Sequence, residues 1–286
     1  MMVKDLKIGD IKKIYPRRAA DSHKGMNGRV MVVGGSVDYY GAPILSGLGA
    51  LYGGADLVHL FVPECNFDVS RSMYPDFIVH SFPGDFLDMK AITPIVDFAK
   101  KCDVVLIGPG LGEREETRTA LATIIKSISI PTVLDSNAIQ VLKKIKEVPR
   151  QQIVITPHHN EFETLTGKDI KISGSLSNKV VLLRTLATDL KINIILKGPE
   201  DLIASDEGEI LKNTTGNPGM TVGGSGDVLS GFVAGLIAQG AMPFAACKIA
   251  AHLFGKVGDD LAKVKGYNFS ATDLAMEIPY VTRDMI

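Results

Sequence analysis

The chain has 286 residues, with 31 basic and 32 acidic side chains and a formal net charge of −1. This balance argues against nucleic-acid binding and against binding to an anionic membrane surface, because both need a basic excess. Hydrophobic residues make up 45% of the chain and charged residues 22%, which excludes a disordered chain. The 29 glycines are about a tenth of the 286 residues, above the usual share of ~7%. This excess indicates tight turns and places where the backbone approaches a ligand closely.

The cysteines and the apolar stretches indicate a cytoplasmic protein. Cys65, Cys102 and Cys247 are far apart and form neither a disulfide framework nor a metal-binding spacing. Residues 1–18 mix charges with apolar side chains, unlike a secretory signal. Residues 228–247 are long enough to span a bilayer, but polar and turn-forming residues near Gly240 favour two helices of a globular core.

Short apolar runs alternate with helical stretches along the chain. We predict strands at 30–33, 57–62, 103–107, 132–134, 153–156 and 194–196, and helices at 42–53 and 115–127. Residues 202–204 and 210–212 are predicted to pair around a turn. From Asp227 onward the chain is predicted to be mostly helical, with a turn near Gly240.

The strands predict an α/β protein. Apolar runs without alternation are buried on both faces, and their alternation with helices favours a parallel sheet. Glycine, Asp, His or Lys follows strand after strand, so we expect the site at the carboxyl edge of the sheet. No linker or repeat interrupts the chain, and a single domain over residues 1–286 is favoured over two.

The richest segment is a glycine-rich entry into a helix. Gly223, Gly224 and Gly226 precede an apolar run, so several backbone N–H groups are expected to point outward and bind a terminal phosphate. Asp227 lies in the first helical turn. It either caps the helix, a role that Ser225 could fill, or accepts the proton of an attacking hydroxyl during phosphoryl transfer.

Two well-known nucleotide motifs do not account for this segment. The chain contains no GxxxxGK[ST] sequence of a Walker loop. Gly110 and Gly112 follow a predicted strand, but Glu113 comes next and the third glycine of a dinucleotide-binding motif is missing.

The run Gly223-Gly224-Ser225-Gly226-Asp227 resembles the anion-hole motif of the ribokinase-like superfamily, in which the Asp is the catalytic base. Further runs resemble one branch, the nucleotide-dependent NAD(P)H-hydrate dehydratase family, and follow the family's order over residues 23–231. They are His23-Lys24-Gly25 with Gly28, Gly34-Gly35-Ser36, Tyr40-Gly41-Ala42, Gly108-Pro109-Gly110-Leu111-Gly112, Leu134-Asp135-Ser136-Asn137-Ala138, Thr156-Pro157-His158, Lys197-Gly198 and Gly216-Asn217-Pro218-Gly219-Met220.

The resemblance implies a three-layer α/β/α ribokinase-like fold with a mainly parallel central sheet and no separate lid domain. It implies a metabolite-repair lyase that phosphorylates the ring hydroxyl of the S-epimer of NADH or NADPH hydrate and then eliminates phosphate. ADP is the expected donor and ATP the less expected one, with Mg²⁺ as cofactor and AMP and phosphate as products. The resemblance also implies a homotetramer. A separate epimerase is expected, because only about 25 residues precede the first strand.

The resemblance also implies roles for individual residues. Positions expected to contact the hydrate are Ala42, Gly110, His158 and Asp227, with Asp227 as the catalytic base. Positions expected to bind the nucleotide are Lys197, Gly198, Pro199, Glu200, Asp201, Gly223, Gly224, Ser225 and Gly226. Glu161 is expected to order the waters of magnesium.

The chain departs from the family pattern at three of its residues. The family's Pro-His-Pro-Gly-Glu run reads Pro157-His158-His159-Asn160-Glu161, which puts the loop shape in question. Asp201 replaces the Thr of a Lys-Gly-x-x-Thr loop, and its charge would repel a nucleotide unless it turns away. These departures leave the choice between ADP and ATP open.

Two other functions remain alternatives. A small-molecule kinase of the same fold, acting on a hydroxymethylpyrimidine or a hydroxyethylthiazole, would share the anion hole and Asp227. A nucleotide-binding regulator without chemistry is the second alternative, which the intact Asp227 disfavours. The sequence leaves the preference between NADH and NADPH hydrate open.

Overall fold

The computed structural model describes residues 3–145, 152–168 and 175–286, and its strands form one ten-stranded sheet. The strand order is β1-β10-β9-β8-β7-β6-β5-β2-β3-β4, and of the described strands only β9 runs against the others. The strands are β1 (Lys4–Asp5), β2 (Arg29–Val33), β3 (Leu57–Pro63), β4 (Phe77–Phe82), β5 (Val104–Ile107), β6 (Thr132–Leu134), β7 (Ile153–Ile155), β8 (Ile192–Leu196), β9 (Asp201–Ala204) and β10 (Ile210–Asn213).

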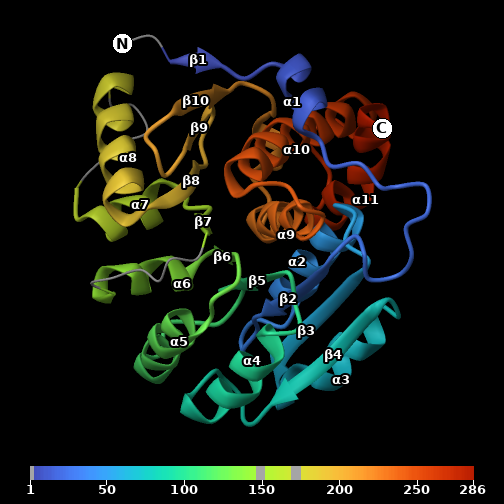
Figure 1. The fold of residues 1–286 in the computed structure, drawn as a ribbon, viewed down its shortest axis with the longest axis vertical. Coiled ribbons are helices and arrows are strands. Elements are labelled where there is room, and N and C mark those ends of the chain that lie inside the picture. The colour runs from blue at the N-terminus through green and yellow to red at the C-terminus, as the bar shows by residue number, and fades with distance from the viewer. Residues whose placement is uncertain (1–2, 146–151, 169–174) are drawn as a thin grey trace.

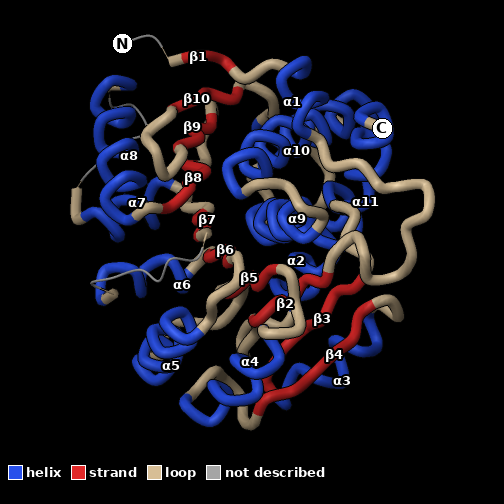
Figure 2. Tube along the Cα trace, viewed as in Figure 1, coloured by secondary structure: helices blue, strands red, loops and turns tan. Residues whose placement is uncertain are grey.

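Helices cover both faces of this sheet (Figures 1 and 2). The helices α2, α9, α10 and α11 contribute to the core on one face, and α4 to α8 to the core on the other. The helices are α1 (Ile8–Ile14), α2 (Gly41–Tyr52), α3 (Glu64–Met73), α4 (Ile92–Ala99), α5 (Glu115–Ser127), α6 (Asn137–Gln140), α7 (His159–Thr166), α8 (Leu176–Leu190), α9 (Ser225–Ala238), α10 (Pro243–Lys265) and α11 (Ala271–Thr282).

The central strands divide their side chains between the two cores. In β2, Val30 and Val32 pack into the core beneath α9 and α10, whereas Met31 and Val33 pack into the opposite core. Successive side chains of a strand point to opposite faces, so a strand covered by helices on both sides must be apolar throughout. The predicted three-layer α/β/α architecture with a mainly parallel sheet is therefore confirmed.

The predicted elements are present, and several others were missed. Each predicted strand overlaps an observed one, and the residues predicted to pair form the antiparallel β9–β10 hairpin. The sequence interpretation missed β1, β4, α1, α3, α4, α6, α7 and α8. In β4, His80 and Ser81 interrupt the apolar run, which this strand at the edge of the sheet tolerates because it is partly exposed.

The long uncharged stretch near the C-terminus forms two helices, as predicted. Helix α9 ends at Ala238 and α10 begins at Pro243, and Gly240 between them adopts a left-handed conformation with φ of 93°. Within the described residues, no helix combines the length and the apolar composition that crossing a bilayer requires.

Helices α2 and α9 run side by side with their backbones in direct contact. A Cβ atom on Gly231 would overlap the carbonyl of Ser46, and one on Gly235 would lie 2.6 Å from the carbonyl oxygen of Ala50. Because both pairs advance by four residues, the helices are parallel and start at the same edge of the sheet. This packing fixes the first residues of α2 relative to those of α9.

Candidate active site

The functional residues predicted from sequence gather at one edge of the sheet. Strands β5, β6, β7 and β8 are neighbours and parallel, so their carboxyl ends meet there. Asp135 follows β6, His158 follows β7 and Lys197 follows β8. The N-termini of α2 and α9 reach the same edge, as expected for the ligand-binding edge of an α/β sheet.

The start of α9 has the features of an anion-binding site. Gly224 is the N-cap residue in a left-handed conformation, and a Cβ atom there would overlap Leu45, so only glycine fits. The amides of Gly226 and Asp227 have no hydrogen-bond acceptor among the described residues. These N–H groups and the helix dipole suit a phosphate. Ser225, a possible cap in the sequence interpretation, is instead the first helical residue, and no side chain caps α9.

Asp227 carries a largely buried carboxylate at this point. No hydrogen bond or ion pair reaches that carboxylate within the described part of the chain. Burial, together with the nearby charges of Asp135 and Glu161, raises the pKa of Asp227 to about 7, against the opposing effect of Lys197. A group with a pKa near neutrality can accept a proton at physiological pH, which suits a general base.

Lys197 is the positive charge of the site. Its Nζ lies 3.5 Å from Oδ1 of Asp135, and a Cβ atom on Gly226 would lie 3.0 Å from the same Nζ. Burial opposes the charge, but the carboxylates of Asp135, Glu161 and Asp227 outweigh it and raise the pKa of Lys197. The ammonium group therefore stays charged beside the free amides of α9.

Asp135 was not predicted to be a site residue. It is 3% exposed, and its Oδ1 also accepts a hydrogen bond of 2.6 Å from the hydroxyl of Thr156. The sequence placed Asp135 at a strand end, and that position was the available signal. The structure shows that it orients Lys197.

His158 and Glu161 hold each other at the start of α7. The His158 amide donates to Oε2 of Glu161 at 2.8 Å, and the Glu161 amide donates to Nδ1 of His158 at 3.2 Å. This capping box fixes the imidazole and places its proton on Nε2. Burial and the charge of Asp135 raise the pKa of Glu161, against the effect of Lys197.

Ala42 and Gly110, both expected to contact the hydrate, lie together. A Cβ atom on Gly110 would lie 3.1 Å from the Cβ of Ala42 and 2.9 Å from that of Tyr39. Gly110 has a φ of 68°, so the loop after β5 also requires a left-handed residue here. The close packing brings the loop after β5 against the start of α2.

The 197–201 loop, expected to bind the nucleotide, joins β8 to β9. Gly198, Pro199 and Glu200 are exposed, and Glu200 pairs with Lys212 at 2.9 Å. Asp201 turns its carboxylate onto the Gly198 amide and the Asn213 side chain, each at 3.1 Å. Burial raises the pKa of Asp201 to about 6.

A pocket of about 200 Å³ adjoins the 197–201 loop. Neither Asp227 nor Asp135 lines it, so this pocket is separate from the charged cluster. Its lining residues are His159, Leu176, Lys179, Leu196, Pro199, Glu200 and Leu202.

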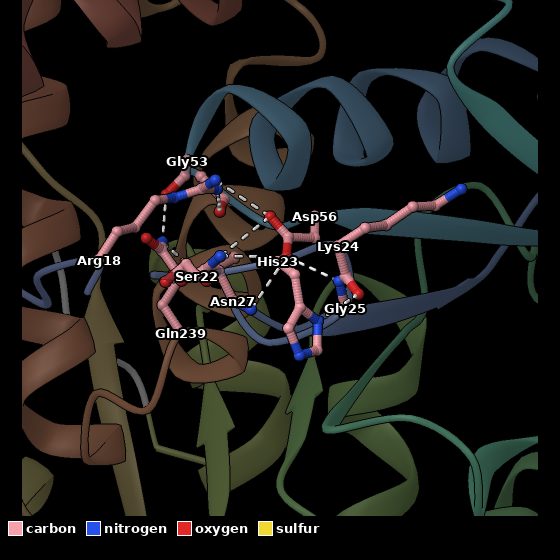
Figure 3. Close-up of polar contacts among 11 residues, drawn as sticks. Arg18, Ser22, His23, Lys24, Gly25, Asn27, Gly53, Asp56 and Gln239 are labelled. Carbon is pink, nitrogen blue, oxygen red and sulfur yellow. Dashed lines mark hydrogen bonds and ion pairs between the residues drawn. The ribbon is translucent and has the colours of Figure 1, made fainter. Parts of the chain in front are cut away.

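The His-Lys-Gly motif lies around Asp56, whose polar contacts Figure 3 shows, and not among the residues of this site. Asp56 accepts hydrogen bonds from the amides of Gly25 and Asn27 at 2.9 and 3.0 Å, and Arg18 pairs with Asp56 at 3.1 Å. A Cβ atom on Gly28 would overlap Ala238, the last residue of α9. A helix of 14 residues is roughly 20 Å long. The motif therefore packs against the C-terminal end of α9, whereas Asp227 lies at its N-terminal end.

Comparison with known proteins identifies the family. A sequence profile of the NAD(P)H-hydrate dehydratase family matches residues 30–280. The chain belongs to this family. The resemblance seen in the sequence motifs is thus confirmed for a segment that includes the glycine-rich helix start and Asp227.

Several relatives resemble this chain along most of its length. The bifunctional NAD(P)H-hydrate repair enzyme Nnr of Pyrobaculum aerophilum is 37% identical over 96% of this chain and 54% of its own length. The ADP-dependent (S)-NAD(P)H-hydrate dehydratase of Nitrosopumilus maritimus is 36% identical over 99% of this chain and 98% of its own. The chain thus spans about half the length of the bifunctional relatives it matches.

Solved structures agree with this family membership. The ADP/ATP-dependent NAD(P)H-hydrate dehydratase of Bacillus subtilis, co-crystallised with ATP and Mg²⁺, superimposes with a TM-score of 0.87 at 25% identity over the full length of both chains. A ribokinase-like superfamily protein of Enterococcus faecalis gives a TM-score of 0.86 at 28% identity, covering 99% of this chain and 96% of its own. The fold of this dehydratase-family chain is therefore ribokinase-like.

Proposed function

We propose that the chain converts the S-epimer of NAD(P)H hydrate to NAD(P)H with ADP as the phosphoryl donor, releasing AMP and phosphate. The observation that carries this proposal is the unpaired, largely buried Asp227 carboxylate beside the free amides of α9 and the ammonium group of Lys197. The names of the relatives point to the same reaction.

The first step is phosphoryl transfer to the ring hydroxyl. Asp227 takes the hydroxyl proton while the hydroxyl oxygen attacks the terminal phosphorus of ADP, and the bond to the bridging oxygen breaks to release AMP. The α9 amides and Lys197 stabilise the charge that develops on the transferring group. Each of these groups is fixed before substrate binds, because α9, β8 and Asp135 hold them.

The second step is elimination. Phosphate leaves with the electrons of the carbon–oxygen bond, the adjacent ring carbon loses a proton to the departing phosphate or to water, and the double bond of the nicotinamide ring forms again. Phosphate is a far better leaving group than hydroxide. This difference explains why a fold of kinases can catalyse a dehydration.

Substrate and nucleotide would occupy different parts of the edge. We propose that Ala42, Gly110 and His158 contact the hydrate, since small residues allow a ring to approach closely and the capping box holds the imidazole. The nucleotide would extend from the glycine-rich start of α9 along the 197–201 loop. This assignment follows the family pattern and the proximity of Lys197 to Gly226.

Magnesium would be bound mainly by the nucleotide. No group of three or more His, Cys, Asp or Glu side chains within the described residues is arranged to hold a metal ion. Mg²⁺ prefers phosphate oxygens and water, with one or two carboxylates. Glu161, close to the charges of Asp135 and Lys197, would order its waters, and the ion would supply neutralisation of phosphate charge.

The decisive experiment is a turnover assay. NADH hydrate is incubated with Mg²⁺ and either ADP or ATP, and the near-ultraviolet absorbance of restored NADH is followed together with the release of AMP or ADP. NADH formation with ADP supports the proposal. Phosphorylation of a pyrimidine or thiazole alcohol without NADH formation would instead support the kinase alternative.

We also propose that the chain acts as a single domain in a cytoplasmic homotetramer, with the epimerase activity supplied separately. The family resemblance supports the tetramer, and the wide spacing of the cysteines supports a reducing compartment. Light scattering on the purified protein tests the tetramer, since any other mass contradicts it.

A further inference from the structure

Two departures from the family pattern converge on the backbone of the 197–201 loop. His159 stands where the family commonly has Pro, and Asp201 stands where it has Thr. Asp201 is the first residue of β9, and His159 is the first residue of α7. The two residues are far apart in sequence, yet both contact the turn that follows β8.

Asp201 holds the loop from the side of the β9–β10 hairpin. Its Oδ1 accepts a hydrogen bond from the Gly198 amide and its Oδ2 accepts one from Nδ2 of Asn213, both at 3.1 Å. The same Nδ2 donates to the carbonyl of Ala251 in α10, also at 3.1 Å. One carboxylate thus ties the exposed loop to β10 and, through Asn213, to the helix layer.

His159 also contacts the loop. A Cβ atom on Gly198 would lie 2.9 Å from Cε1 of His159, so the imidazole lies directly against the loop backbone. Burial and the charge of Lys179 lower the pKa of His159, and a hydrogen bond with the backbone of Lys197 opposes this. A proline at position 159 would bring no imidazole to this contact with Gly198.

We propose that Asp201 and His159 are positioning residues, which fix the backbone of Lys197 and Gly198 for the adenine nucleotide without contacting the nucleotide themselves. This inference rests on the proposed function, because it takes the 197–201 loop as part of the nucleotide site. Both carboxylate oxygens of Asp201 already accept hydrogen bonds from the protein. The carboxylate is therefore directed at donors of the protein itself, which is the arrangement expected if it turns away from a bound nucleotide.

The test measures ADP binding and turnover separately. Asp201→Asn keeps the size of the side chain but replaces one acceptor oxygen by an NH₂ group. That group faces either the Gly198 amide or the Asn213 side chain, both of which are donors, so one of the two hydrogen bonds is lost. We expect the Kd of ADP with Mg²⁺, measured by calorimetry, to rise about tenfold while kcat stays within about threefold of wild type. His159→Ala should raise the same Kd, and the double variant should show less than the product of the two effects.

Glu207→Gln is the matched control, since it removes an exposed carboxylate from the turn of the same hairpin. It should leave the Kd unchanged. If wild type fails to bind ADP or ATP, the proposed function fails. Two outcomes would contradict the positioning role while leaving the proposed function intact. In the first, Asp201→Asn and His159→Ala bind ADP as tightly as wild type or more tightly. In the second, the two variants lose kcat with an unchanged Kd. Should Asp201→Asn fail to fold, as judged by thermal melting, His159→Ala decides.

Discussion

A Cβ atom on Gly226 would lie 3.0 Å from Nζ of Lys197, so the first turn of α9 and the end of β8 meet at a glycine. The absence of a side chain there lets the ammonium group stand beside the free amides. Gly226→Ala would place a methyl group in that space and displace Lys197. We expect kcat/KM in the NADH-hydrate assay to fall about tenfold or more, because small misplacements of reacting groups are costly.

The same substitution should not weaken the fold. Alanine is favoured over glycine inside a helix by about 0.5–1 kcal/mol, so the Tm of Gly226→Ala should equal or exceed that of wild type. Gly9→Ala is the control, since Gly9 lies in α1 with no atom within 4 Å of the added Cβ. Equal activity of the two alanine variants would contradict the proposed role of the Lys197–Gly226 contact.

Asp227→Asn should abolish most turnover and preserve nucleotide binding. Asparagine keeps the size of the side chain but cannot accept the hydroxyl proton, and general-base catalysis contributes about 10²–10⁴-fold. The affinity for ADP should stay equal or increase, because a negative charge near the phosphates is removed. The checks are kcat with NADH hydrate and calorimetric binding of ADP. A variant that retains more than about a tenth of the wild-type kcat would show that Asp227 is not the base.

The pH dependence of the reaction should report the ionisation of Asp227. Its pKa of about 7 means that the carboxylate is increasingly protonated below neutral pH and can no longer accept a proton. We expect log kcat/KM to fall with a slope of about one per pH unit below pH 7. The residual rate of Asp227→Asn should lack this step. A wild-type profile that stays flat down to pH 5 would refute the assignment.

Asp227 should also cost stability once it is ionised. Its pKa of about 7 in the folded protein lies above the ordinary value of 3.8. Ionisation of this carboxyl group therefore lowers the free energy of unfolding progressively between about pH 4 and pH 7, and the full loss is reached above pH 7. Three pKa units correspond to at most about 4 kcal/mol. Asp227→Asn should therefore melt above wild type at pH 8, by no more than about 16 °C, and the difference should shrink toward pH 4. Equal melting temperatures at both pH values would contradict this.

The sequence predicted the fold and the catalytic edge where local chemistry determined them. Uninterrupted apolar runs such as β2 must be buried on both faces, and glycines before an apolar helix leave amides free. The edge strand β4 was missed because partial exposure permits His80 and Ser81. The role of Asp135 could not be predicted either, since it depends on Lys197 and Thr156, which only the sheet brings close.

The parallel contact of α2 with α9 restricts how this protein can be altered. Gly231 and Gly235 admit no side chain where they meet Ser46 and Ala50, so a random library would yield few folded variants there. The distance between Ala42, in the first turn of α2, and Asp227, in the first turn of α9, is therefore fixed by the packing of the two helices. If the proposed function holds, engineering for a different hydroxyl substrate should vary the segment just ahead of α2, where Tyr39 and Tyr40 are exposed.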